Sequence, residues 1–117
     1  MSQPNDTRRY PRYKGLKAVP VAWMHGTLRY VSKAENLSLG GLFISTPTPP
    51  PVGALVVLLF NTPEGEVRVR ATVRNHVAGQ GMGLAITSMD QEHRARLSRW
   101  LQLLSKQAES AESVAAK

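Results

Sequence analysis

The chain contains six short segments typical of β-strands: several alternate with a period of two, 54–60 is apolar throughout, and most are followed by Gly, Pro or Asn. Alternation with a period of two is typical of β-strands that bury one face, and these turn residues are typical of the connections between strands. We therefore expect an all-β fold, a closed or sandwich-like antiparallel barrel of six strands. The segments lie at residues 16–24, 27–35, 41–46, 54–60, 66–78 and 82–87.

Two of these segments have features that the fold must accommodate. Pro20 has no amide hydrogen to donate, so we expect it at a sheet edge, a bulge or a bend. In segment 66–78 the valines alternate with arginines, which predicts one core face and one basic face. We interpret the basic face as solvated, with direct contact to phosphate as the alternative. Its arginines are Arg68, Arg70 and Arg74.

A single helix is expected after the last strand. Ser88 and Gln91 have the spacing of a capping box, which predicts a helix over residues 89–106. Its apolar residues recur at helical spacing and form a stripe that should pack on the sheet or close one end of the barrel. Residues 107–117 lack an apolar face, so we expect a fraying tail there. The stripe consists of Leu97, Trp100, Leu101 and Leu104.

Length and charge limit what the chain can do. Its 117 residues suffice for one domain, and its net charge of 15 − 8 = +7 favours an anionic partner such as a nucleotide, a nucleic acid or a membrane surface. The absence of Cys excludes disulfides and thiolate chemistry and fits a cytoplasmic protein. The first residues have no apolar signal segment, and the longest apolar run, 54–60, is too short to span a bilayer, so no membrane insertion is expected.

The sequence offers no catalytic or metal-binding constellation. Its three histidines lie in unrelated segments, without a carboxylate at ligand spacing, and no nucleophile has a neighbouring base. The glycines at 79–83 lack the full dinucleotide-loop pattern and precede a strand. We therefore expect neither an enzyme nor a metal protein. The histidines are His25, His76 and His93.

Two polar motifs remain as candidates for ligand binding. The first is the turn at 36–41, where an amide, a hydroxyl and a glycine follow one another as N-x-S-x-x-G in Asn36, Ser38 and Gly41. The second is a basic arm at 8–14, which carries the pattern RxxxR from Arg8 to Arg12. Guanidinium groups pair bidentately with phosphate and stack on flat bases, so such an arm suits a nucleotide.

An RxxxR motif followed at this distance by N-x-S-x-x-G resembles the PilZ domain, a family that binds cyclic di-GMP. Arg12 lies 24 residues before Asn36, which occupies the position where the family usually has Asp. The run Gly81-Met82-Gly83-Leu84 before the last strand, together with the closing helix, extends the likeness to about Leu104. The resemblance implies a PilZ-like domain over 8–106, with residues 8–14 as ligand-binding arm and 16–87 as barrel. Residues 1–7 are polar and include Pro4, so we expect a disordered tail there.

The resemblance implies that the protein is a non-enzymatic receptor whose ligand is cyclic di-GMP and which has no other cofactor. It would change conformation on binding and signal to an unidentified downstream protein in the control of motility, adhesion or polysaccharide export. Ligand contacts would come from Arg8, Arg9 and Arg12 in the arm and from Asn36, Ser38 and Gly41 in the turn.

Two other functions remain open. One is a PilZ-like adaptor that no longer binds nucleotide and serves only as a protein-interaction module. The other is a small basic barrel that binds single-stranded nucleic acid, for which stacking aromatics should be plentiful on a strand face. The chain has only seven aromatic residues, so no stable complex with nucleic acid is expected.

Overall fold

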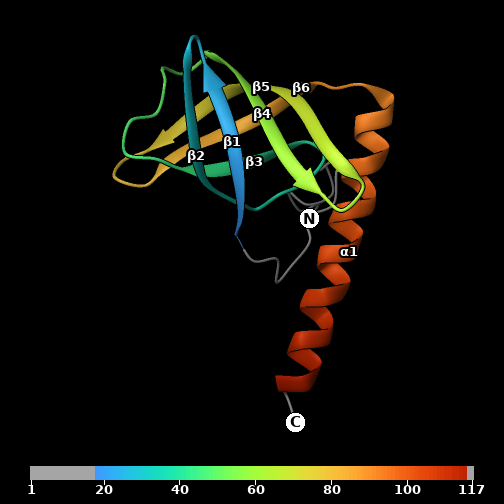
Figure 1. Ribbon diagram of the computed structural model, residues 1–117. Coiled ribbons are helices and arrows are strands. Elements are labelled where there is room, and N and C mark those ends of the chain that lie inside the picture. The colour runs from blue at the N-terminus through green and yellow to red at the C-terminus, as the bar shows by residue number, and fades with distance from the viewer. Residues whose placement is uncertain (1–17, 116–117) are drawn as a thin grey trace, which may run out of the picture.

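The computed structural model describes residues 18–115, with side chains described as far as residue 107. Six strands are followed by one helix that runs along the barrel and extends beyond it (Figure 1). The elements are β1 (Val19–His25), β2 (Leu28–Glu35), β3 (Gly41–Ser45), β4 (Leu55–Thr62), β5 (Gly65–Val77), β6 (Gly81–Ser88) and α1 (Gln91–Ala115).

The six strands form a closed antiparallel barrel in the order β1-β2-β3-β6-β5-β4, which confirms the predicted fold. The barrel closes where β4 pairs with β1 over Ala22–Met24. Pro20 pairs only with β2, at Lys33, and lies before the β1–β4 pairing begins. Its missing amide hydrogen is therefore tolerated at an edge, as expected.

The alternation along β5 decides which residues enter the core. Val67, Val69, Ala71 and Val73 are buried, while the arginines between them are exposed, as the sequence predicts. β1 and β4 contribute in the same way, and the largest buried side chain is that of Trp23, which stacks on Tyr30 across the β1–β2 pair with ring centroids 4.3 Å apart. The barrel interior is thus filled by the inward faces of its strands.

The helix packs on the outside of the sheet and buries further apolar side chains there. Leu97 and Leu101 are fully buried, and Trp100 packs against Phe60 with ring centroids 5.9 Å apart. Their spacing of three and four residues is that of one helix face. The predicted apolar stripe is confirmed as the surface that docks α1 onto β4 and β5.

Polar side chains spaced three residues apart on α1 bind successive positions of the β4–β5 hairpin. Side chains three residues apart lie on one face of the helix, so each successive turn of α1 reaches the next position along the hairpin. They join His93 Nδ1 to the Arg68 amide at 2.9 Å, Arg96 Nη1 to the Glu66 carbonyl at 2.7 Å, and Arg99 Nε to the Glu64 carboxylate at 2.8 Å. The hydrogen bond from Arg99 lowers the pKa of the Glu64 carboxyl.

The helix starts two residues after the predicted position, and the predicted end at residue 106 was wrong. The helix begins at Gln91 because Ser88 still belongs to β6, where it pairs with Arg70, and the first helical hydrogen bond runs from the Arg94 amide to the Asp90 carbonyl. Asp90 therefore occupies the N-cap position. The helix continues past residue 106 to Ala115, since the Ala, Ser and Glu residues there include neither Gly nor Pro.

The other predicted boundaries lie within about two residues of the observed ones where residues are described. Residues 16 and 17 of the first predicted strand, like the tail at 1–7 and the arm at 8–14, lie outside the described residues. Within 18–115 no helix combines the length and apolar character needed to cross a bilayer.

The burial of Leu101 predicts a large loss of stability on its truncation. Leu101→Ala should lower the free energy of unfolding by about 2 to 5 kcal/mol, because it removes a buried side chain and leaves a cavity. Leu103→Ala is the matched control, since Leu103 lies on the same helix turn but is 42% exposed. Urea denaturation followed by circular dichroism measures both, and equal losses would show that α1 does not dock as described.

Candidate ligand-binding site

The turn between β2 and β3 begins at a residue in the left-handed backbone region. Asn36 has φ of 54°, and it is the one residue other than glycine with positive φ among residues 18–115. Asn and Asp tolerate this conformation better than other side chains do. The identity of Asn36 therefore follows partly from the backbone, while its side chain is exposed and available to a ligand.

Ser38 holds the turn together. Its hydroxyl accepts hydrogen bonds from the amides of Gly40 at 3.1 Å and Gly41 at 3.2 Å, and its own amide donates to the Gly41 carbonyl at 3.0 Å. The residue is only 8% exposed. Ser38 thus shapes the loop that would present a ligand, so its side chain acts first on the turn and only through the turn on anything bound to it.

Gly41 is required by close packing. A Cβ atom at this position would overlap with the backbone carbonyl oxygen of Leu84 on β6, to which β3 is paired. The preceding Gly40 carbonyl accepts the Ile86 amide at 2.9 Å, so the turn is bonded to β6 on both sides of Gly41. Leu37, buried at 3% exposure, anchors the turn in the core.

The structure therefore brings together three of the predicted site residues, Asn36, Ser38 and Gly41, in one turn. The remaining three, Arg8, Arg9 and Arg12, lie outside the described residues. The register still places the arm's point of attachment, because Val19 at the start of β1 pairs with Ala34, two residues before Asn36. An extended chain spans at most about 3.5 Å per residue, so the 7 residues from Arg12 to Val19 give the arm a reach of roughly 25 Å around this end of the barrel.

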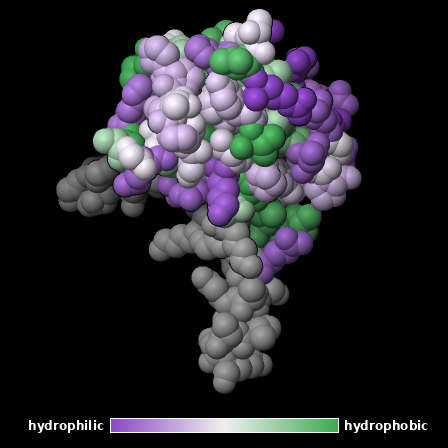
Figure 2. Space-filling model, turned by 60° about the vertical axis from the view of Figure 1, so that its left-hand side comes forward, coloured by the Kyte–Doolittle hydropathy of each residue, from purple (hydrophilic) through white to green (hydrophobic). Residues whose placement is uncertain are grey.

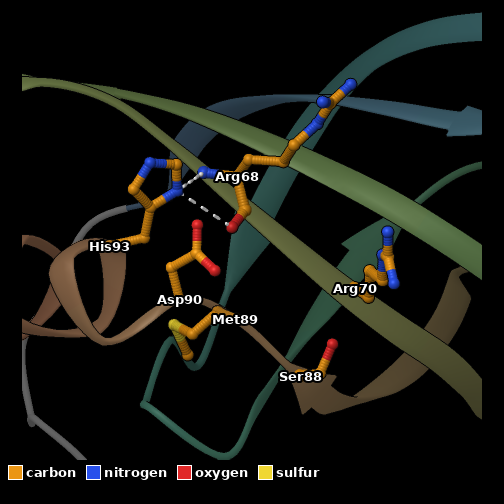
Figure 3. Close-up of a pocket in the computed structure, with 6 residues that line it drawn as sticks. All are labelled: Arg68, Arg70, Ser88, Met89, Asp90 and His93. Atoms are coloured by element: carbon orange, nitrogen blue, oxygen red, sulfur yellow. Dashed lines mark hydrogen bonds between the residues drawn. The ribbon is translucent and has the colours of Figure 1, made fainter.

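A pocket with a cavity volume of about 370 Å³ lies between β5, the end of β6 and the start of α1 (Figure 3). In Figure 3 the Arg68 and Arg70 side chains extend toward the same side of β5, and the His93 ring faces the Arg68 backbone. Neither guanidinium forms an ion pair within the described part of the chain. The lining residues are Arg68, Arg70, Ser88, Met89, Asp90 and His93.

Sequence reasoning found only part of this pocket. The alternation along β5 correctly placed Arg68 and Arg70 on one outer face. Ser88 was interpreted only as part of a helix start, and nothing in its spacing to Gln91 indicated that this end of α1 would lie beside β5. Among the described residues no group of three or more His, Cys, Asp or Glu side chains could hold a metal ion.

Comparison with known proteins identifies the family of the chain. A sequence model of the PilZ domain matches residues 6–103, which is most of the chain. The chain belongs to the PilZ domain family. No curated protein matches it in sequence.

Solved structures of PilZ proteins share the fold. The Bacillus subtilis inhibitor of motility (MotI/DgrA) is similar with a TM-score of 0.67 and 16% identity over 89% of this chain, which spans only about half, 52%, of that one. The PilZ domain of CeSA from a cellulose-synthesizing bacterium is similar with a TM-score of 0.58 and 22% identity, over 75% of this chain and 93% of that one. These likenesses confirm the PilZ barrel with its C-terminal helix.

The bonding of Ser38 predicts that its hydroxyl stabilises the fold without any ligand. Ser38→Ala should lower the free energy of unfolding by about 1 to 3 kcal/mol, because two backbone amides in a largely buried turn lose their acceptor. Ser45→Ala is the control: Ser45 lies on the neighbouring β3, is half-buried, and its hydroxyl makes no hydrogen bond within the described residues. Thermal unfolding of the two variants without nucleotide decides the matter, and equal stability would refute a structural role for Ser38.

Proposed function

We propose that this PilZ domain is a non-enzymatic receptor for cyclic di-GMP that signals to a protein partner. The observation that carries the proposal is the turn at 36–41, where an exposed Asn36 amide is held on a loop that Ser38 and Gly41 make rigid. A rigid loop with one exposed polar group is a preorganised contact, which lowers the entropic cost of binding.

The basic arm supplies the second half of the proposed site. Arg8, Arg9 and Arg12 would pair with the two ligand phosphates and with guanine acceptors, contacts for which the guanidinium group is well shaped. The attachment of the arm beside Ala34 supports this, because it keeps the arginines within reach of the turn. The ligand would then lie between arm and barrel, and ordering of the arm would be the signal that a partner detects.

An adaptor that recognises only protein is the second candidate, and it would be expected to present a contiguous apolar surface. On the face shown in Figure 2, hydrophobic residues form separate patches among hydrophilic ones. The large exposed hydrophobic residues that are described lie on four different parts of the chain: Leu28 and Val31 on β2, Val52 before β4, Leu55 on β4, and Leu103 on α1. Positive charge is therefore the more prominent recognition feature of the described surface.

The proposal predicts that Arg12 in the arm contributes more to ligand affinity than an arginine outside both motifs. Arg12→Ala should weaken binding of cyclic di-GMP roughly 10- to 150-fold, the equivalent of about 1.5 to 3 kcal/mol for charge-assisted hydrogen bonds. Ser38→Ala should weaken it less, through the altered turn. Isothermal titration calorimetry on each variant provides the affinities.

The control for this experiment is Arg74→Ala. Arg74 is exposed on β5, next to Val73, which pairs with Leu84 on β6 and so lies beyond Gly41 as seen from the turn. Its removal subtracts the same charge and should leave the affinity nearly unchanged. Equal losses for Arg12→Ala and Arg74→Ala, in folded proteins, would replace the proposed site by a diffuse basic surface, and a wild-type protein that fails to bind would favour the adaptor.

A further inference from the structure

The pocket at the junction of β5, β6 and α1 has no role in the function proposed so far. We infer that it holds one guanine nucleotide of the bound ligand, with Arg70 at a phosphate and Asp90 at the hydrogen-bond donors of the base. This inference rests on the proposed binding of cyclic di-GMP and extends the site across β6.

The pocket lies beside the turn that begins the site. The Gly40 carbonyl bonds to Ile86, and Ser88, two residues further along β6, pairs with Arg70 on β5. Only one strand therefore separates the turn from Arg70, and two strand spacings amount to about 10 Å. A ligand with two nucleotide units can bridge that distance.

Neither guanidinium group of the pocket forms an ion pair among the described residues. Arg68 and Arg70 are neighbours on the outer face of β5, exposed, and without an ion pair in the described part of the chain. Two adjacent positive charges repel each other, and a phosphate placed between them relieves this repulsion and accepts hydrogen bonds from both. His93 helps to hold this strand segment, through its hydrogen bond with the Arg68 amide.

Asp90 gives the pocket a character that a simple phosphate site would not have. Its backbone carbonyl accepts the Arg94 amide at 2.8 Å, whereas its carboxylate makes no hydrogen bond or ion pair among the described residues. Figure 3 shows this carboxylate on the pocket wall, apart from the guanidinium of Arg70. A carboxylate repels phosphate but accepts the N1–H and N2–H₂ donors of guanine, so its presence beside arginines favours a guanine nucleotide over inorganic anions.

The size of the pocket agrees with one nucleotide unit of the ligand. Its volume of about 370 Å³ lies near the lower limit of small-molecule sites, which range from about 300 to 1,000 Å³. The half-buried side chain of Met89 adds an apolar surface against which a base can pack. The second nucleotide would then face the turn at 36–41.

The first test compares three arginines by calorimetric titration with cyclic di-GMP. Arg70→Ala should weaken binding roughly 10- to 150-fold, as expected for the loss of charge-assisted bonds to phosphate. Arg74 lies four residues from Arg70 on the same strand, about 13 Å away at 3.3 Å per residue, so Arg74→Ala should have little effect on the affinity. If wild type binds and Arg12→Ala weakens binding while Arg70→Ala equals Arg74→Ala, the pocket inference fails and the proposed function stands. If wild type does not bind, both fail.

The second test concerns the base and uses cyclic di-IMP, which lacks the two exocyclic amines of cyclic di-GMP. Asp90→Asn keeps a good N-cap residue but replaces one of the two carboxylate acceptors by a donor. The preference for cyclic di-GMP over cyclic di-IMP, expressed as the ratio of their affinities, should therefore be smaller in Asp90→Asn than in wild type. The exocyclic amine of guanine and the Asp90 carboxylate are partners in one interaction, so removing either one removes the same contribution. Glu92→Gln, which removes a nearby charge from the 81% exposed Glu92 side chain, should leave the ratio unchanged. An unchanged ratio in Asp90→Asn would overturn the assignment of the base.

Discussion

The close approach of β3 to β6 at Gly41 is the constraint on which the rest of the structure depends. A side chain at Gly41 would overlap with the Leu84 carbonyl, so only glycine lets the two strands pair here and the barrel close on this side. The same contact brings Gly40 to Ile86 and leaves the turn no freedom to open. A turn held in this way fixes the position of Asn36, and its bond to Ile86 brings it alongside the strand that ends at Ser88.

The fold was predictable because it depends mainly on alternation. Along β5, every second residue from Val67 to Val73 enters the core, and a period of two carries that information in the sequence itself. Pro20 was equally informative, since a missing donor restricts a strand in any fold. The helix ends were not predictable from local signals. Ser88 is a residue type that caps helices, but its pairing with Arg70 keeps it in β6. Pairing between strands depends on residues distant in the sequence, so the residues around Ser88 do not indicate it.

The candidate site was predictable only as far as a contiguous motif reaches. Asn36, Ser38 and Gly41 lie within six residues and were found together, although the burial of Ser38 shows that part of the motif serves the backbone. Arg70 and Asp90 are 20 residues apart in sequence, and the pocket that they line exists because α1 docks on β5 through Leu97 and Leu101. Residues that meet only through packing of this kind leave no local pattern in the sequence.

The central claim is that the turn and the pocket form one ligand surface at one end of the barrel. Backbone amide chemical shifts, recorded by NMR during titration with cyclic di-GMP, test it most directly. The account predicts large shifts at residues 36–41, 68–70 and 88–90, and small ones at 52–53 and 79–80, where the opposite end of the barrel lies. Shifts confined to the turn, or spread evenly over both ends, would contradict it.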